Sequence, residues 1–279
     1  VTVSIVGIGR RRQMMSRFIA AMDHSGGSTG GVLDRYHQEY TEDNKMALVH
    51  EMRMRMVSSD DFNSDNIWAA ILYKDTVDRG MVSYLKNKDI YSFLKIDSGC
   101  NEDGTLKQFP VEQMLEFAKQ QGCIGTKMRS IIKNSKYMDE VLDQQFAIAK
   151  TILTYGLIPI VEPEIEINDR DKIVHEYRLR DKLYDLLDSV NGQIILKLTL
   201  PDEPNFYKRV SEHSSVYKLV GLSGGYSTHE ACERLSVQQG MIASFSRALS
   251  EGLYANLNDN EFNEVMSWNI ENIVKASST

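Results

Sequence analysis

Short apolar segments alternate with longer amphipathic segments along most of this chain. The apolar segments are nearly continuous rather than alternating with polar residues, which is typical of parallel strands covered on both faces. Eight of them are predicted strands, at residues 18–22, 67–72, 93–96, 123–127, 157–161, 194–200, 217–222 and 241–245.

The segments between most of these strands carry apolar residues at helical spacing. In the segment 138–155, for example, Met138, Val141 and Leu142 fall on one side of a helix, and Gly156 follows as a stop signal. Six helices are predicted, at residues 44–57, 110–121, 138–155, 170–187, 228–239 and 259–276.

Alternation of eight strands with helices predicts an α/β protein of the (β/α)₈ or TIM-barrel type. The 279 residues fit the usual size of such a barrel, about 250 residues. We expect residues 1–279 to form a single domain, with residues 1–16 as a lead-in without assigned structure. The main alternative is an open doubly wound sheet, but no linker divides the chain into two halves, which favours closure.

The start of the chain resembles a dinucleotide-binding fold only superficially. In G-x-G-x-x-G the first two glycines would be Gly7 and Gly9, but the third position is Arg12, so the motif fails.

The charge balance bears on the partners of the protein. The chain has 32 basic and 39 acidic residues, a net charge of −7, which argues against a general nucleic-acid binder. A local basic cluster can still bind small anions. No apolar stretch approaches the ~18 residues of a membrane span, so no membrane is expected as a partner.

The three cysteines, Cys100, Cys123 and Cys232, have neither zinc-ligand nor disulfide-framework spacing. We therefore expect no metal site. Reduced thiols fit a cytoplasmic protein. The six histidines are expected to be solvated or capping residues, although His24, beside Asp23, is placed to touch a substrate.

Titratable side chains interrupt several of the apolar strands. Lys197 lies in the middle of the segment 194–200, although a lysine is rarely fully buried without a partner. Apolar surroundings favour the neutral, nucleophilic form of its amine. The active site of a barrel lies at the carboxyl ends of its strands. The residues predicted to meet there are Asp23, Lys95, Asp97, Lys127, Arg129, Glu162, Glu164, Lys197 and Thr199.

Each of these residues taken singly could be a solvated or paired group at a strand end, but a set of this size favours an active site.

Two further segments have features typical of phosphate-binding sites. Ser223, Gly224 and Gly225 follow the seventh predicted strand, and their backbone amides can approach an anion closely. Ser246 and Arg247 follow the eighth strand, and the loops after strands 7 and 8 of a barrel frequently bind phosphate.

With these motifs the chain resembles the bacterial branch of the class I fructose-1,6-bisphosphate aldolases, from about Phe18 to Leu249. The motifs that carry the resemblance are residues 20–23, 94–97, 126–129, 159–164, 196–197, 222–225 and 244–249. They occur in the expected order on the expected strands.

The resemblance implies catalytic roles for five residues. Lys197 would be the lysine that forms a Schiff base with the ketone, and Glu162 the general acid and base. Glu164 would hold Lys127 and Lys197 in place. Lys127 would help to keep the amine of Lys197 neutral through its positive charge. Asp23 would hydrogen-bond the substrate hydroxyls and deprotonate the C4 hydroxyl.

The resemblance also implies two phosphate sites. The site for the dihydroxyacetone half would consist of Ser223, Gly224, Gly225, Ser246 and Arg247. The other phosphate would lie near Ser25, Ser28, Lys95 and Arg129, where residues 23–28 form a second glycine-rich turn. Gly31 and Ser98 stand where relatives commonly carry basic residues, which weakens this second site.

The implied function is the reversible cleavage of fructose 1,6-bisphosphate in glycolysis and gluconeogenesis. A protonated imine is the electron sink, so neither metal nor cofactor is expected. The expected partner is a small sugar phosphate, with the chain acting alone or as a homo-oligomer in the cytoplasm. Two alternatives stay open, namely another phosphorylated ketose (fructose 1-phosphate, tagatose or sedoheptulose bisphosphate) and a non-catalytic binding role. The C-terminal residues 275–279 differ from relatives with a tyrosine tail, so tail-dependent steps are not assumed.

Overall fold

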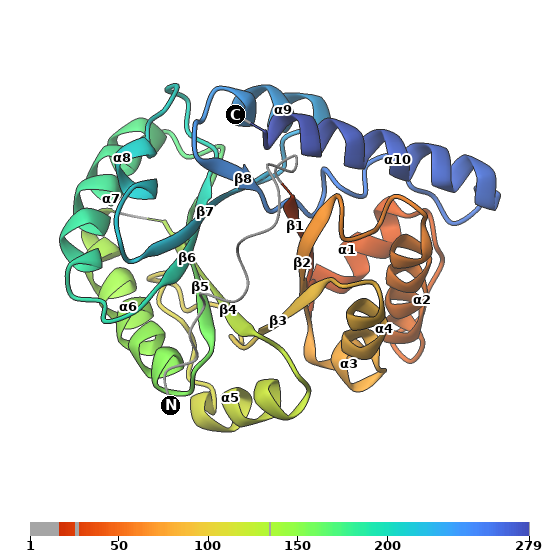
Figure 1. Cartoon of the computed structure of the whole chain (residues 1–279), viewed down its shortest axis with the longest axis horizontal. Helices are drawn as coiled ribbons and strands as arrows, with labels where there is room; N and C mark the ends of the chain where they lie inside the picture. Colours follow the sequence, from red (N-terminus) through yellow and green to blue (C-terminus); the bar gives the residue numbers. More distant parts are fainter. Residues whose placement is uncertain (1–16, 26–27, 134, 279) are drawn as a thin grey trace.

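The computed structural model describes residues 17–25, 28–133 and 135–278. Within them, eight parallel strands form one sheet in the order β1 to β8, curved into a barrel with helices around the outside (Figure 1). Sequential strand order is the order of a barrel, whereas a doubly wound sheet reverses its order at a switch point. The predicted barrel is confirmed and the open-sheet alternative is wrong. The predicted lead-in, residues 1–16, lies outside the described residues.

The strands lie where the apolar segments predict them. They are β1 Phe18–Met22, β2 Ile67–Leu72, β3 Tyr91–Lys95, β4 Gly125–Ile132, β5 Ile158–Ile165, β6 Ile194–Thr199, β7 Val216–Leu222 and β8 Met241–Ala243. Between the two ends of the sheet, the N–H of Ala21 in β1 donates to the carbonyl of Phe245, just after β8, at 3.0 Å. This bond brings the first and last strands together.

The six predicted helices are present, with ends that shift by a few residues. They are α2 Lys45–Ser58, α5 Val111–Gln120, α6 Met138–Thr154, α7 Lys172–Leu187, α9 Thr228–Ser236 and α10 Asp259–Ala276. The described residues also contain α1 Ser28–Arg35, α3 Lys74–Asp78, α4 Met81–Asn87, α8 Lys208–Ser211 and the 3₁₀ turn η2 Ser135–Tyr137.

The sequence does not predict α1 because Gly30 and Gly31 lie inside it, and glycine is a poor helix former. The helix forms because Val32 and Leu33 bury their side chains in the fold. Tertiary packing thus outweighs local propensity here.

Strand β5 is longer than predicted. It continues to Ile165 and pairs with β4 along its whole length, from Ile158 opposite Gly125 to Ile165 opposite Ile132. Its Glu-Pro-Glu sequence resembles a strand end, since proline and glutamate are disfavoured in strands. Consequently Glu162 and Glu164 lie inside β5, not after it as predicted.

An apolar layer fills the inside of the barrel below the site. Trp68 lies near its centre, with ring centroids 5.8 Å from both Phe93 and Tyr217. A second, larger core lies between the sheet and the helices. The polar side chains of the predicted site lie above this layer, toward the carboxyl ends of the strands, as is usual in these barrels.

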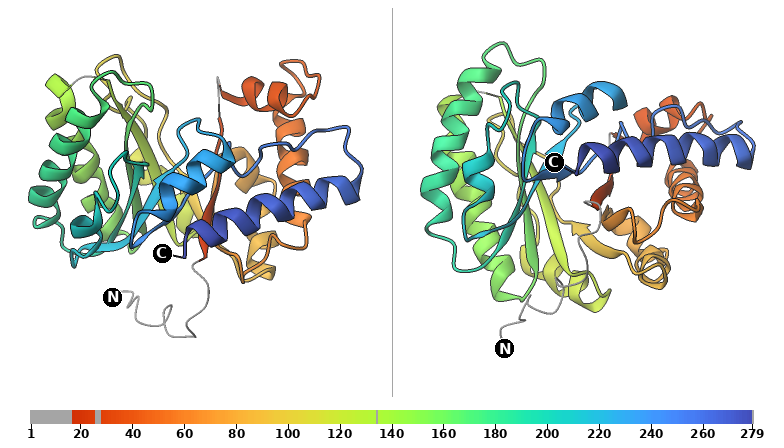
Figure 2. Two further views of the ribbon diagram at one scale, coloured as in Figure 1. Left: turned by 90° about the horizontal axis from the view of Figure 1, so that it is seen from above. Right: turned by 45° about the horizontal axis from the view of Figure 1, so that its top comes forward.

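Helix α10 supports the loop that follows β8. It lies along α9 and beside β8 (Figure 2). The side-chain amide of Asn269 in α10 donates to the carbonyls of Leu249 and Glu251 at 3.0 and 2.9 Å. These bonds hold the chain just beyond Ser246 and Arg247 in place.

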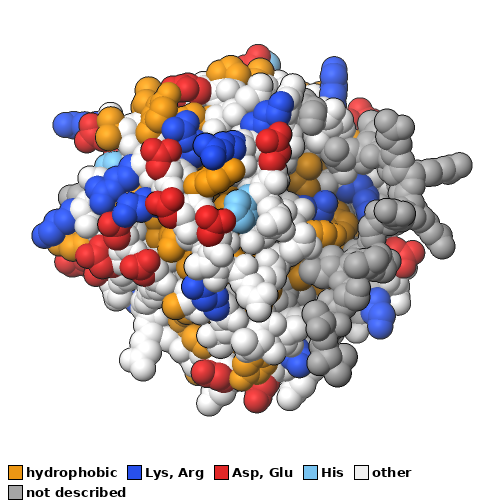
Figure 3. All heavy atoms as spheres, turned by 60° about the vertical axis from the view of Figure 1, so that its left-hand side comes forward, with side chains coloured by type: hydrophobic (Ala, Val, Ile, Leu, Met, Phe, Trp, Pro, Cys, Tyr) orange, Lys and Arg blue, Asp and Glu red, His pale blue; other side chains and the backbone are white. Residues whose placement is uncertain are grey.

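The outer face over α6 to α8 carries basic and acidic side chains next to one another, with apolar side chains between them (Figure 3). Ile173, Val174 and Tyr177 of α7 are large apolar residues exposed to solvent. No helix within the described residues has the length and apolar character needed to cross a bilayer.

The close contact between β4 and β5 makes Gly125 a sensitive position. A Cβ added there would lie 2.1 Å from the carbonyl oxygen of Ile158 and 2.5 Å from the Phe93 ring. We expect Gly125→Ala to lower the free energy of unfolding by about 3 kcal/mol or more, measured by urea denaturation.

Gly80→Ala is the matched control, because Gly80 has φ +87° but, among the described residues other than its neighbours in the chain, no atom lies within 4 Å of its added Cβ. Its cost is the left-handed conformation alone, about 1–2 kcal/mol. Equal losses in the two variants would contradict a steric origin for the effect at Gly125.

Candidate active site

A cavity of about 930 Å³ lies at the carboxyl ends of the strands. Most of the residues predicted for the site line it, namely Asp23, Ser25, Lys95, Asp97, Lys127, Arg129, Glu162, Glu164, Lys197, Ser223, Gly224, Ser246 and Arg247. Thr199 does not line it and instead ties β6 to β5, donating to the carbonyl of Ile165 at 2.6 Å. The Ser28 side chain, Gly26 and Gly27 lie outside the part of the chain that the structure describes.

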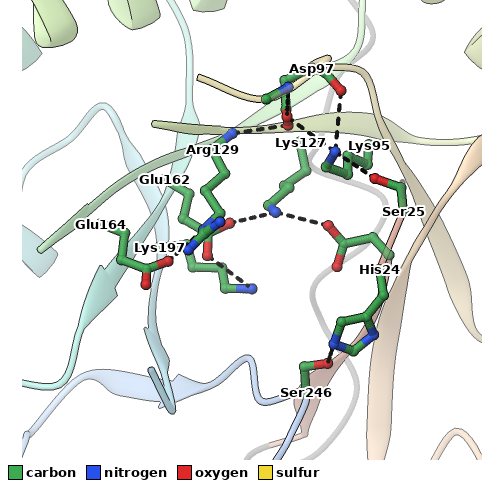
Figure 4. A network of polar contacts seen from close by, with 12 residues as sticks. His24, Ser25, Lys95, Asp97, Lys127, Arg129, Glu162, Glu164, Lys197 and Ser246 are labelled. Carbon is green, nitrogen blue, oxygen red and sulfur yellow. Dashed lines mark hydrogen bonds and ion pairs between the residues drawn. The ribbon is translucent and has the colours of Figure 1, made fainter. Parts of the chain in front are cut away.

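A chain of ion pairs crosses the centre of the cavity (Figure 4). The Nζ of Lys127 lies 2.8 Å from Asp23 Oδ2 and 2.7 Å from Glu162 Oε2. The other oxygen of Glu162 lies 3.4 Å from the Nζ of Lys197. All four side chains are buried, so these charges interact in a medium of low effective dielectric constant.

Pairing decides the charge state of Lys127 and Asp23. Burial disfavours the charged form of each, but the partner charges outweigh burial. The carboxylates of Asp23 and Glu162 therefore raise the pKa of Lys127 above its ordinary value. The ammonium groups of Lys127 and Lys197 lower the pKa of Asp23 well below its usual range. Asp23 is thus a carboxylate and Lys127 an ammonium ion at neutral pH.

Lys197 is in the opposite situation. Its burial lowers the pKa of its amine, and the nearby charge of Lys127 lowers that pKa further. The carboxylate of Glu162 acts in the other direction but does not restore the ordinary value. The lowered pKa increases the fraction of Lys197 that is a neutral amine, and a neutral amine can attack a carbonyl carbon.

The structure corrects the role implied for Glu164. This residue was expected to hold Lys127 and Lys197, but its ion pair is with Arg129, with Oε2 2.5 Å from Nε. The ion pairs to both lysines come from Glu162 instead. The sequence alternation places both glutamates toward the cavity, but only the barrel geometry decides which one reaches the lysines.

A second group of polar residues lies at the end of β3. The Nζ of Lys95 lies 3.1 Å from Asp97 Oδ1 and donates to Ser25 Oγ at 3.0 Å. Asp97 also accepts bonds from the N–H groups of Gly99 and Arg129, at 3.0 and 3.2 Å. Asp97 therefore orders both the loop after β3 and the position of Lys95.

The glycine-rich turn after β7 has the conformation that its sequence suggests. Gly224 and Gly225 have φ values of +59° and +119°, and the N–H of Tyr226 closes the turn on the carbonyl of Ser223 at 2.8 Å. A Cβ on Gly225 would lie 2.9 Å from a guanidinium nitrogen of Arg247. Arg247 therefore lies against this turn, as expected for two parts of one anion site.

Three residues at or near the cavity were not among the predicted site residues, namely Arg35, Arg53 and His24. Arg35 of α1 lines the cavity. Arg53 of α2 is buried behind it and donates to the carbonyl of His24 at 2.7 Å. His24 also lines the cavity and has its Nε2 3.0 Å from Ser246 Oγ. Only the placement of His24 beside Asp23 and of Arg35 one turn after Gly31 could have suggested these positions.

His24 is the histidine that was expected to be able to touch a substrate, and it lines the cavity. Burial lowers the pKa of His24 to about 4, helped by the charges of Arg53, Arg35 and Lys127 and opposed by Asp23. Its imidazole is neutral at neutral pH. Among the described residues, no group of three or more His, Cys, Asp or Glu side chains has the geometry of a metal site.

A buried amine beside a carboxylate, at the mouth of a (β/α)₈ barrel, is the arrangement that an imine-forming enzyme needs. A family model described as fructose-bisphosphate aldolase class-I matches residues 8–187, more than half of the chain. A curated relative, the fructose-bisphosphate aldolase class 1 of Synechocystis sp., is 46% identical over 94% of each chain. The chain belongs to the class I fructose-bisphosphate aldolase family and is a lyase of the metal-independent class.

Solved structures agree with the fold. The fructose-bisphosphate aldolase of Plasmodium falciparum, solved with TRAP and a small-molecule inhibitor, superimposes with a TM-score of 0.76 at 19% identity, covering 94% of this chain and 90% of that one. An archaeal fructose-1,6-bisphosphate aldolase, whose catalytic lysine is covalently bound to the carbinolamine intermediate, gives a TM-score of 0.55 at 13% identity. It covers 93% of this chain and 94% of that one.

The proximity of Lys127 to Lys197 predicts a pH effect. Lys127→Met removes a like charge and frees Asp23 and Glu162, and both changes raise the pKa of Lys197. The pH at which the Lys197 amine becomes reactive should then rise by about one unit. Trace acetylation with acetic anhydride at several pH values, followed by peptide mass spectrometry, measures this shift.

Lys95→Met is the control, since Lys95 lines the same cavity but pairs with Asp97. It should leave the acetylation profile of Lys197 unchanged. If Lys127→Met also leaves the profile unchanged, Lys127 does not control the protonation of Lys197.

Proposed function

We propose that this chain catalyses the reversible aldol cleavage of fructose 1,6-bisphosphate to dihydroxyacetone phosphate and glyceraldehyde 3-phosphate, through an imine on Lys197. The observation that carries the proposal is the buried Lys197 amine, whose pKa is lowered while Glu162 lies 3.4 Å away. Family membership supports the substrate, and the reaction would serve glycolysis and gluconeogenesis.

The first step uses Lys197 and Glu162. The neutral amine attacks the ketone carbon and forms a carbinolamine, and the amine proton passes to the ketone oxygen. Glu162 takes a proton from the Lys197 ammonium ion before the attack and returns it to the carbinolamine hydroxyl, which leaves as water, so a protonated imine remains and Glu162 is again a carboxylate. Glu162 suits both proton transfers because it contacts Lys197 through one oxygen and Lys127 through the other.

The second step uses Asp23. Its low pKa keeps it ionised, so that it accepts the proton of the C4 hydroxyl. The C3–C4 bond breaks, its electron pair moves into the protonated imine to give an enamine, and the C4 carbon leaves as the aldehyde. Protonation of the enamine at C3 and hydrolysis of the imine then release dihydroxyacetone phosphate and restore Lys197.

The two phosphate groups would bind at opposite sides of the cavity. The turn of Ser223 to Gly225, with Ser246 and Arg247, lies on the strands next to Lys197 and suits the phosphate near the ketone. Lys95, Ser25 and Arg129 lie on the other side and suit the second phosphate. Ser28 begins α1, and its part in this site stays a prediction.

The substrate range also stays a prediction. Gly31 and Ser98 line the cavity, and neither carries a positive charge that would hold a phosphate. Fructose 1-phosphate, tagatose bisphosphate and sedoheptulose bisphosphate are the alternatives to compare with fructose 1,6-bisphosphate. A cytoplasmic location suits a glycolytic enzyme and is part of the proposal, as is a homo-oligomer that would cover the exposed apolar residues of α7.

Borohydride trapping tests the central step. Reduction in the presence of fructose 1,6-bisphosphate should attach a three-carbon phosphate to Lys197, as located by peptide mass spectrometry. Lys197→Met should remove both the adduct and the cleavage activity, and EDTA should change neither in the native enzyme.

Lys218 provides an internal control. Burial lowers the pKa of its amine too, and it lies on the neighbouring strand β7, but it does not line the cavity. The Lys218→Met protein should therefore form the borohydride-reduced adduct on Lys197 as the native enzyme does. An adduct on another lysine, or activity that EDTA abolishes and zinc restores, would contradict the proposal.

A further inference from the structure

Two arginines at the cavity lack an acidic partner. Arg35 comes from α1 and Arg247 from the loop after β8, and both line the cavity. Within the part of the chain that the structure describes, neither guanidinium group forms an ion pair or a hydrogen bond. The cations at the opposite side differ, because Lys95 pairs with Asp97 and Arg129 pairs with Glu164. Among the described residues, Arg35 and Arg247 therefore contribute uncompensated positive charge at their side of the cavity, as Lys133 does beyond β4.

Both side chains are exposed to solvent and line the same cavity. The pKa of Arg35 is lowered, first by partial burial and then by the charge of Arg247, while Asp34 acts in the other direction. A nitrogen of Arg35 lies 3.5 Å from the position of a Cβ on Gly31, one helical turn earlier. Arg35 thus folds back along α1 over a glycine that lines the cavity.

The groups around this pair suit an anion. The hydroxyl of Ser246 lies next to Arg247 in the chain and 3.0 Å from the imidazole of His24. His24 is neutral, because its pKa is lowered to about 4, so it adds no third positive charge. An anion between Arg35 and Arg247 would remove their mutual repulsion and gain charge-assisted hydrogen bonds, which arginine forms well with phosphate.

We propose that Arg35 is a substrate-binding residue. Together with Arg247, it binds the phosphate next to the ketone. The inference rests on the proposed function and adds a residue to its site. The position favours this phosphate, because Arg247 lies against the turn that follows β7, and β7 pairs with the strand that carries Lys197. Helix α1 reaches this side of the cavity because β1 lies beside the end of β8 in the barrel.

Substitution of Arg35 by glutamine tests the assignment. Arg35→Gln should raise KM for both fructose 1,6-bisphosphate and fructose 1-phosphate by about 10- to 100-fold, the value of a lost charged hydrogen bond, with kcat nearly unchanged. Arg180→Gln is the matched control, because Arg180 of α7 pairs with Asp181 away from the cavity. It should change neither constant.

Fructose 1-phosphate separates the two phosphate sites, since it carries only the phosphate next to the ketone. A rise in KM for fructose 1,6-bisphosphate alone would assign Arg35 to the other phosphate and overturn the proposal. Unchanged KM values for both sugars would also overturn it.

A rescue variant separates charge from structure. Gly31→Lys placed in the Arg35→Gln protein restores a cation one turn earlier, where, among the described residues, an added Cβ has only Arg35 within 4 Å. Partial recovery of KM for fructose 1-phosphate supports the phosphate contact, and no recovery in a folded protein counts against it.

Binding of inorganic phosphate, measured by ³¹P NMR titration, distinguishes failure of this inference from failure of the proposed function. If the native protein cleaves neither sugar, the proposed function fails. Weaker phosphate binding by Arg35→Gln than by Arg180→Gln would then still support an anion contact at Arg35. Equal phosphate binding by the two variants would overturn the contact whatever the activity.

Discussion

The buried ammonium group of Lys127, held between Asp23 and Glu162, is the interaction on which the site depends. It joins the end of β1 to β4 and β5, so it fixes side chains from separate parts of the barrel. Without it Asp23 would remain buried without an ion pair and Glu162 would keep only its contact with Lys197, and breaking such a buried pair typically costs about 3–5 kcal/mol. The same charge lowers the pKa of Lys197, so one ion pair network both orders the site and favours its nucleophile.

The polar groups of the cavity differ from one side to the other. Near β3 and β4, Lys95 pairs with Asp97 and Arg129 pairs with Glu164. Near β7, β8 and α1 the arginines have none among the described residues. A bisphosphate would then be held most firmly at the end nearest Lys197, where its ketone must react. The arrangement explains how phosphate binding can position the carbonyl group against a buried amine.

Much of the barrel could be predicted because its strands are continuous apolar segments, and Lys197 stood out inside one of them. Helix α1 could not, since Gly30 and Gly31 disfavour a helix that only the packing of Val32 and Leu33 stabilises. The ion-pair partner of Glu164 could not be predicted from the sequence either. Two glutamates two residues apart point the same way, and which of them reaches a lysine depends on distances across the barrel.

The sequence by itself determined the order of the strands, the lysines inside them and the glycines of the phosphate turn, because these follow from local patterns of burial and backbone freedom. Only the tertiary structure decided which charges meet. Asp23 and Lys127 are far apart in the chain yet 2.8 Å apart in space. Arg35 and Arg247 come from opposite ends of the chain, and the closure of the barrel brings them to one cavity. Their interaction depends on distance, which local sequence does not encode.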